Sequence, residues 1–126
     1  MQDKDKAKIL LVEDEAMVAM VMRWSLEHLG YAVCATVATG EDAVRAAQAC
    51  TPDLVLMDVH LPGGLSGIEA AQQIATQQDV PFIFFSGYSE EEIAEQAYPL
   101  EPVACLSKPV ETHVLASVIA EALNRS

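Results

Sequence analysis

Basic residues are scarce in this chain of 126 residues. It contains 7 Lys and Arg residues against 19 Asp and Glu residues, which gives a formal net charge of −12. A protein with this balance repels the phosphate backbone of nucleic acids, so we expect no nucleic-acid partner. Solubility is a sufficient explanation for the acidic surface itself.

Long apolar runs are also missing. No stretch of the sequence approaches the ~18 consecutive apolar residues that are needed to cross a membrane. Residues 1–8 are polar and charged, and they lack the apolar segment of a signal peptide. We therefore expect no membrane association and a cytoplasmic location.

Cysteine is rare as well, with three residues, Cys34, Cys50 and Cys105. The number is odd, and no pair has the CxxC spacing that is typical of metal or redox sites. This pattern favours buried, reduced thiols over disulfides or zinc ligands, and reduced thiols agree with a cytoplasmic location.

What the sequence does contain is an alternation of short apolar runs and helix-like segments. With 52% apolar residues, the chain is large enough for one domain with a real core. Runs of this kind predict buried parallel strands joined by right-handed crossovers, with helices on both faces of the sheet. We expect strands at residues 8–12, 32–35, 54–58, 81–86 and 103–107, and helices at residues 15–29, 41–49, 67–77, 90–97 and 111–123.

Several element boundaries carry chemical signals. Gly30 follows the first helical segment as a stop. Ser66 with Glu69, and Ser89 with Glu92, fit the capping box, in which a hydroxyl and a carboxylate satisfy free amides at the start of a helix. The domain is expected to span residues 8–124 after a flexible tail at residues 1–7.

Polar residues end or directly follow four of the predicted strands. They are Glu13 and Asp14, Asp58, Ser86, and Lys108. Because the carboxyl ends of parallel strands meet at one edge of the sheet, we expect these side chains to share a pocket.

The three acids of this group suggest a metal site. Asp14 alone could cap the following helix, but beside Glu13 and Asp58 it would form a cluster of like charges. Such a cluster either retains protons or binds a cation. Mg²⁺ fits because it prefers oxygen ligands and is often held by one or two carboxylates together with a phosphate.

The remaining chemistry points to phosphoryl transfer. A carboxylate such as Asp58 can act as a nucleophile and form an aspartyl phosphate. Such a transfer depends mainly on positioning and charge neutralisation, which the Lys108 ammonium and the Ser86 hydroxyl are suited to provide.

Four motifs make the chain similar to the response regulator receiver domain of two-component signalling, and the resemblance covers residues 8–123. The motifs are ILLVEDE at residues 9–15, LVLMDVHLP at 54–62, FSG at 85–87 and SKP at 107–109. The resemblance implies a flavodoxin-like α/β fold with strand order 2-1-3-4-5.

The resemblance also implies the site chemistry. Asp58 would accept a phosphoryl group from a histidine kinase or a histidine phosphotransfer protein, and Ser86 and Lys108 would hold that group. Mg²⁺ would be bound by Asp14, by Asp58, by the backbone carbonyl of His60 and, through water, by Glu13. A cis peptide bond is expected between Lys108 and Pro109.

The chain departs from the family pattern at Cys105, where an aromatic residue usually moves together with the hydroxyl residue on phosphorylation. A thiol is too small to make a comparable change in packing. We expect Ser86 and Cys105 to lie at the switch, and Tyr98 either takes over the role of the aromatic residue or only packs.

The first helical segment has more apolar residues than one face can bury. One side of the helix suits the sheet and is formed by Val18, Val21, Met22, Ser25, Leu26 and Leu29. A second row is formed by Met17, Met20 and Trp24. This row either packs under a neighbouring helix or docks a partner's helix, as the resemblance implies for a kinase.

We therefore expect a phosphoacceptor switch, not an enzyme beyond self-phosphorylation and autodephosphorylation, that contacts an unidentified downstream protein as a monomer or weak dimer. Few residues follow the last predicted helix, which suggests a stand-alone regulator; a receiver excised from a larger protein is the alternative. An aspartyl-nucleophile phosphatase would need an acid at position 60, where this chain has His60. A flavin carrier is disfavoured because Glu13, Asp14 and Glu15 would repel the flavin phosphate.

Overall fold

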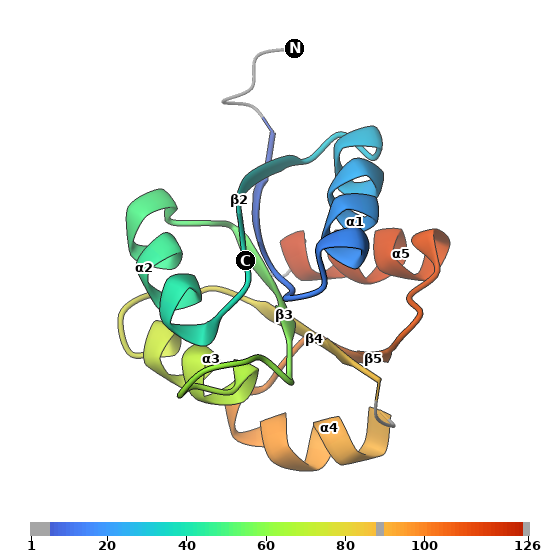
Figure 1. Ribbon diagram of the computed structural model, residues 1–126. Coiled ribbons are helices and arrows are strands. Elements are labelled where there is room, and N and C mark those ends of the chain that lie inside the picture. The colour runs from blue at the N-terminus through green and yellow to red at the C-terminus, as the bar shows by residue number, and fades with distance from the viewer. Residues whose placement is uncertain (1–5, 88–89, 125–126) are drawn as a thin grey trace.

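Five parallel strands form one sheet with the order β2-β1-β3-β4-β5 in a computed structural model, which describes residues 6–87 and 90–124. This is the expected strand order (Figure 1). The strands are β1 (Lys8–Val12), β2 (Ala32–Val37), β3 (Leu54–Asp58), β4 (Phe82–Ser86) and β5 (Ala104–Ser107).

Helices cover both faces of this sheet. In Figure 1, α1 and α5 lie together on one side, and α2, α3 and α4 lie on the other. The helices are α1 (Ala16–His28), α2 (Gly40–Cys50), α3 (Gly67–Ala75), α4 (Glu90–Ala97) and α5 (Thr112–Leu123), and the short 3-10 helix η2 (Tyr98–Leu100) follows α4.

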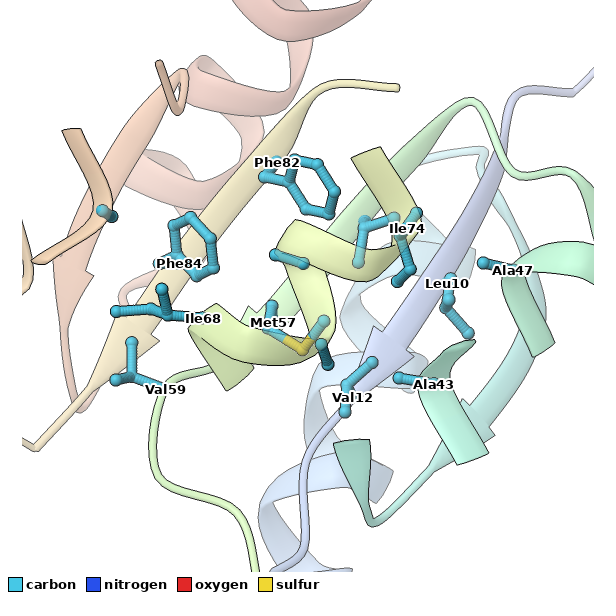
Figure 2. Close-up of a cluster of buried hydrophobic side chains, with 14 of the residues drawn as sticks. Leu10, Val12, Ala43, Ala47, Met57, Val59, Ile68, Ile74, Phe82 and Phe84 are labelled. Carbon is cyan, nitrogen blue, oxygen red and sulfur yellow. The ribbon is translucent and has the colours of Figure 1, made fainter. Parts of the chain in front are cut away.

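The sheet separates two hydrophobic cores because successive side chains of a strand point to opposite faces. On the first face, residues of β1, β3 and β4 pack against α2, α3 and α4, as Figure 2 shows for Leu10, Met57, Phe84 and Ile74. On the second face, other residues of the same strands pack against α1 and α5. β3 and β4 are buried along their whole length, so the residues at their carboxyl ends are held in place by the cores on both faces.

The predicted boundaries are close to those observed. Gly30 ends the first helix with a positive φ of 96°, and the capping box of Ser66 and Glu69 is formed. β2 is longer than predicted by two residues, because its second half pairs with β1 despite being only partly buried. Ser89, with the second proposed capping box, lies outside the described residues.

The cysteine prediction is wrong for two of the three residues. A disulfide joins Cys34 on β2 to Cys50 at the end of α2, with a Cα–Cα distance of 6.4 Å, and both residues are only half-buried. Cys105 is free. The pair could not be predicted from the sequence, because the packing of α2 against β2, and not a short CxxC spacing, brings the two residues together. The cysteines thus give no support to the expected cytoplasmic location.

No helix among residues 6–87 and 90–124 is long and apolar enough to cross a membrane. The exposed face of α1 is nevertheless rich in apolar side chains. Met17, Met20 and Trp24 are 70%, 59% and 61% exposed, so they do not fold under a neighbouring helix. Two residues that were predicted to face the sheet are exposed instead: Val21, at 58%, joins this row, and Leu29 is 38% exposed. Ala19, which was not predicted to face the sheet, is buried in the core.

Candidate functional site

The ends of the parallel strands bring the predicted site residues to one edge of the sheet. The strands are in register at this edge, and the neighbouring residues are Val12 and Met57, Asp58 and Phe85, and Ser86 and Ser107. Glu13, which follows β1, and Lys108, which follows β5, therefore lie next to Asp58 at the end of the central strand β3.

Lys108 is the cationic centre of this site. Its Nζ atom lies 2.8 Å from Glu13 Oε1, 3.0 Å from Asp58 Oδ2 and 3.5 Å from Glu15 Oε1. Glu13 and Asp58 are buried, whereas Asp14 and Glu15 are exposed. One ammonium group therefore faces several carboxylates, and the site retains an excess of negative charge.

The Asp58 carboxylate is held from two sides. Its Oδ1 atom accepts a hydrogen bond from the backbone N–H of His60 at 3.0 Å, while Oδ2 faces Lys108. The Lys108–Pro109 peptide bond is cis, as expected, and the N–H of Lys108 donates to the carbonyl of Ser86 at 2.7 Å. The backbone contact fixes Lys108 against the end of β4, and its side chain reaches the end of β3.

Burial and charge act in opposite directions on the two central groups. Burial raises the pKa of the Glu13 carboxyl, and the ion pair with Lys108 and the hydrogen bond from Glu15 N only partly offset this effect. Burial alone would lower the pKa of the Lys108 ammonium, but its contacts with Glu13 and Asp58 outweigh burial and raise that pKa. Lys108 therefore stays charged, whereas the ionised form of Glu13 lowers the stability of the folded protein.

The donor set fits a magnesium ion. Oxygen atoms of Glu13, Asp14 and Asp58 all lie within 4.8 Å of one another. Glu13 Oε1 is buried, and its contact with Lys108 has ion-pair distance but makes no hydrogen bond. A hard divalent cation with oxygen ligands would satisfy this atom and offset the excess negative charge.

Neutralising Glu13 should stabilise the metal-free protein. We expect Glu13→Gln to raise the free energy of unfolding by about 0.5–2 kcal/mol at pH 8, because the amide removes a buried charge and retains the shape. The folded-state pKa of Glu13 is raised. The ionised carboxyl therefore costs stability above that pKa, and the cost disappears as the pH falls below the unfolded pKa of about 4.5.

Urea unfolding with EDTA at pH 8 and at pH 4 measures this effect. The gain should be present at pH 8 and absent at pH 4, and saturating Mg²⁺ should reverse it at pH 8. Asp79→Asn, at an exposed carboxylate, is the matched control and should change stability little. If Glu13→Gln raised the free energy of unfolding equally or more at pH 4, the gain would not come from removal of the Glu13 charge, and the prediction would be contradicted.

The other predicted residues lie around this centre. Ser86 is fully buried at the end of β4, and the exposed His60 follows β3. Cys105 is half-buried on β5 beside Phe84, and it borders a shallow, open surface pocket that is also lined by Tyr98. Tyr98 is 73% exposed. Its ring therefore does not replace, in a buried position, the aromatic residue that the family usually has at position 105.

Sequence reasoning missed two contributors to the site. Glu15 was not assigned a role, although it reaches Lys108; its position directly after the acidic pair was the available signal. Gly67 was interpreted only as a helix start, yet a Cβ at this position would overlap the carbonyl oxygen of Asp58 and lie 2.9 Å from Val59 Cα. No sequence signal distinguishes such a packing glycine from an ordinary loop glycine.

Together, the 2-1-3-4-5 sheet and the cluster of carboxylates with a lysine at its carboxyl edge define a flavodoxin-like α/β protein. Residues 9–120 match the family model described as the response regulator receiver domain. The chain belongs to this family.

Relatives and solved structures agree with this assignment. The chain is 33% identical over 118 residues to the transcriptional regulatory protein PdtaR of Mycobacterium tuberculosis, covering 94% of this chain and 57% of that protein. It is 32% identical to the phyllosphere-induced regulator PhyR of Methylorubrum extorquens, covering 92% of this chain and 43% of PhyR. The chain thus spans about half the length of the curated relatives that it matches.

Two solved structures are similar over nearly their whole length. The signal receiver domain of a modulated diguanylate cyclase from Desulfovibrio desulfuricans G20 is 36% identical, with a TM-score of 0.88 and coverage of 96% of both chains. The receiver domain of PhyR from Erythrobacter litoralis is 31% identical, with a TM-score of 0.86 and coverage of 99% of this chain and 95% of that chain.

Proposed function

We propose that the chain is a phosphoacceptor switch in which Asp58 takes a phosphoryl group from a phosphohistidine. The P–N bond of the donor breaks as a bond forms between phosphorus and an Asp58 carboxylate oxygen. Hydrolysis later returns inorganic phosphate and the free carboxylate. The observation that carries this proposal is the position of the buried Asp58 carboxylate between Lys108 and the N–H of His60.

The surrounding residues have complementary roles in the proposal. Asp14, Asp58 and the backbone carbonyl of His60 would hold Mg²⁺, with Glu13 acting through water. The ion supplies neutralisation of the phosphoryl charge. Lys108 and Ser86 would bind phosphoryl oxygens, and Lys108 would then exchange a carboxylate partner for the phosphoryl group. The chain itself would only assist its phosphorylation and dephosphorylation.

The switch in this proposal has an unusual packing partner. Ser86 would reorient toward the phosphoryl group, and the change would reach the surface through β4 and β5. Because Cys105 replaces the usual aromatic residue, the signal would depend on backbone and helix movement and not on a large side-chain rotation. The altered surface would then bind a downstream protein.

Incubation with Mg²⁺ and acetyl phosphate, followed by intact mass spectrometry, tests the proposed function. We expect one labile phosphoryl group per chain, and EDTA should prevent its incorporation. A protein that stays unmodified at saturating Mg²⁺ and acetyl phosphate would contradict the proposal, provided that its folding is confirmed by circular dichroism.

The exposed row on α1 is the proposed surface for the phosphodonor. Met17, Met20, Val21 and Trp24 are spaced at i, i+3, i+4 and i+7, so they form one stripe along the helix. The Trp24 ring packs against His28, with 4.0 Å between ring centroids. A flexible methionine stripe with an aromatic anchor is suited to a partner's helix.

Removal of the Trp24 side chain should slow phosphorylation by a protein phosphodonor but not by acetyl phosphate. We expect Trp24→Ala to slow phosphotransfer from a histidine kinase or phosphotransfer protein about 30-fold, which corresponds to a hot-spot loss of about 2 kcal/mol. The rate with acetyl phosphate should not change, because that donor needs no docking surface. Tyr98→Ala, at another exposed aromatic residue, is the control. Equal slowing with both donors would contradict a docking role.

A further inference from the structure

The loop between β3 and α3 is anchored from outside the site by Glu41, in the first turn of α2. Glu41 Oε2 accepts a hydrogen bond from the backbone N–H of Gly64 at 3.1 Å. The same carboxylate lies close to Gly63, where a Cβ would meet Oε1 at 3.2 Å. One side chain from α2 therefore covers two consecutive residues of the loop.

The backbone around this contact leaves little freedom. A Cβ at Gly40, the first residue of α2, would lie 2.7 Å from Leu65 Cβ and 2.9 Å from the Leu65 carbonyl oxygen. The start of α2 and the loop are thus in close contact at Gly40 and again at Glu41. Past the loop, Gly67 N–H donates to the carbonyl of Val59 at 2.9 Å and closes it against the end of β3.

This loop begins at the phosphoacceptor. His60 is two residues from Asp58 and donates its N–H to the Asp58 carboxylate at 3.0 Å. Gly64 follows His60 by four residues in the chain, with its N–H held by Glu41. The residues between Asp58 and Gly64 are therefore tied to the structure at both ends, by one contact within the site and by one outside it.

We propose that Glu41 is a positioning residue for Mg²⁺, which sets the affinity for the ion by holding the loop that carries the His60 carbonyl. This inference rests on the proposed function, because that function places the carbonyl in the metal site. Glu41 does not act as a ligand. Groups that hydrogen-bond to a metal ligand typically change metal affinity about 10- to 100-fold when they are removed, and we expect an effect at the lower end of this range because Glu41 reaches the ligand through the backbone of the loop.

Four variants separate the hydrogen bond from the charge. Glu41→Ala removes both, Glu41→Gln retains an acceptor oxygen without the charge, and Glu41→Asp retains the charge on a shorter side chain. Asp42→Ala is the matched control, because Asp42 is an acid in the same helical turn whose carboxylate forms an ion pair with Arg45.

Titration of each ¹⁵N-labelled protein with MgCl₂ alone, followed through the amide signals of His60 and Gly64, measures the dissociation constant without any phosphodonor. We expect Glu41→Ala and Glu41→Asp to bind about 10-fold more weakly, with faster hydrogen exchange at Gly64. Glu41→Gln should stay within about 2-fold of the wild type, and Asp42→Ala should not differ from it.

The outcomes distinguish this inference from the proposed function. A wild-type protein that binds no Mg²⁺ would overturn both. If the wild type binds Mg²⁺ and Glu41→Asp binds it equally well, only the role of Glu41 is overturned. Equal weakening in Glu41→Gln and Asp42→Ala would also overturn it, because the effect would then be one of net charge. If Glu41→Ala does not fold, Glu41→Asp and Glu41→Gln decide the question.

Discussion

Asp58→Asn should abolish incorporation of the phosphoryl group from acetyl phosphate. The amide is close to the carboxylate in shape and can still accept the His60 N–H, so the fold should be retained. It is not a nucleophile, however, and it removes one of the three charges near the proposed metal. The expected result is complete loss of the added mass under conditions that modify the wild type fully.

Asp53→Asn is the matched control for this loss. Asp53 is an exposed aspartate just before β3, where it accepts a hydrogen bond from the N–H of Lys8 at 2.7 Å, far along the strand from the site. We expect this variant to be phosphorylated as the wild type is. Retention of a phosphoryl group in Asp58→Asn would place the modification on another residue and would refute the role of Asp58.

Gly67→Ala should strongly destabilise the protein. A Cβ at Gly67 would overlap the backbone carbonyl oxygen of Asp58, which cannot move without shifting the end of the buried strand β3. Overpacking against backbone of this kind typically costs 1–3 kcal/mol and occasionally more, so we expect a loss of about 2–4 kcal/mol in the free energy of unfolding. Because the clash is at Asp58, the phosphorylation rate of the folded fraction should fall as well.

Gly87→Ala provides the comparison, because a Cβ at Gly87 meets no atom within 4 Å among residues 6–87 and 90–124, its chain neighbours aside. Urea unfolding of the two variants should show a shift of less than about 1 kcal/mol for Gly87→Ala. Equal stability of Gly67→Ala and the wild type would contradict the close approach of α3 to the end of β3.

The fold was largely predictable because its signals are local. Apolar runs of strand length, a glycine stop at Gly30 and the capping box at Ser66 mark element boundaries without any knowledge of tertiary contacts. The continuous apolar runs of β3 and β4 also indicate strands that are buried on both faces, as in parallel sheets. The sides of α1 were harder to assign, although the signal was present: Val21 has the i+4 spacing from Met17 that places it in the exposed row, whereas Ala19 has the spacing of the buried Met22.

The site was predictable as far as strand ends determine it. Glu13 and Lys108 directly follow strands, Asp58 is the last residue of one, and the sheet alone brings the three together. Contacts that depend on how a helix packs could not be predicted. The Cys34–Cys50 disulfide and the contact of Glu41 with Gly64 both need α2 in its place, and no spacing in the sequence encodes that placement.

Borohydride trapping of the phosphorylated protein tests the central claim most directly. An acyl phosphate on an aspartate is reduced to homoserine, which tandem mass spectrometry locates within the chain. We predict homoserine at position 58 alone, formed only after incubation with Mg²⁺ and a phosphodonor. Homoserine at position 14, or an unreduced phosphate ester on Ser86 with Asp58 intact, would contradict the account.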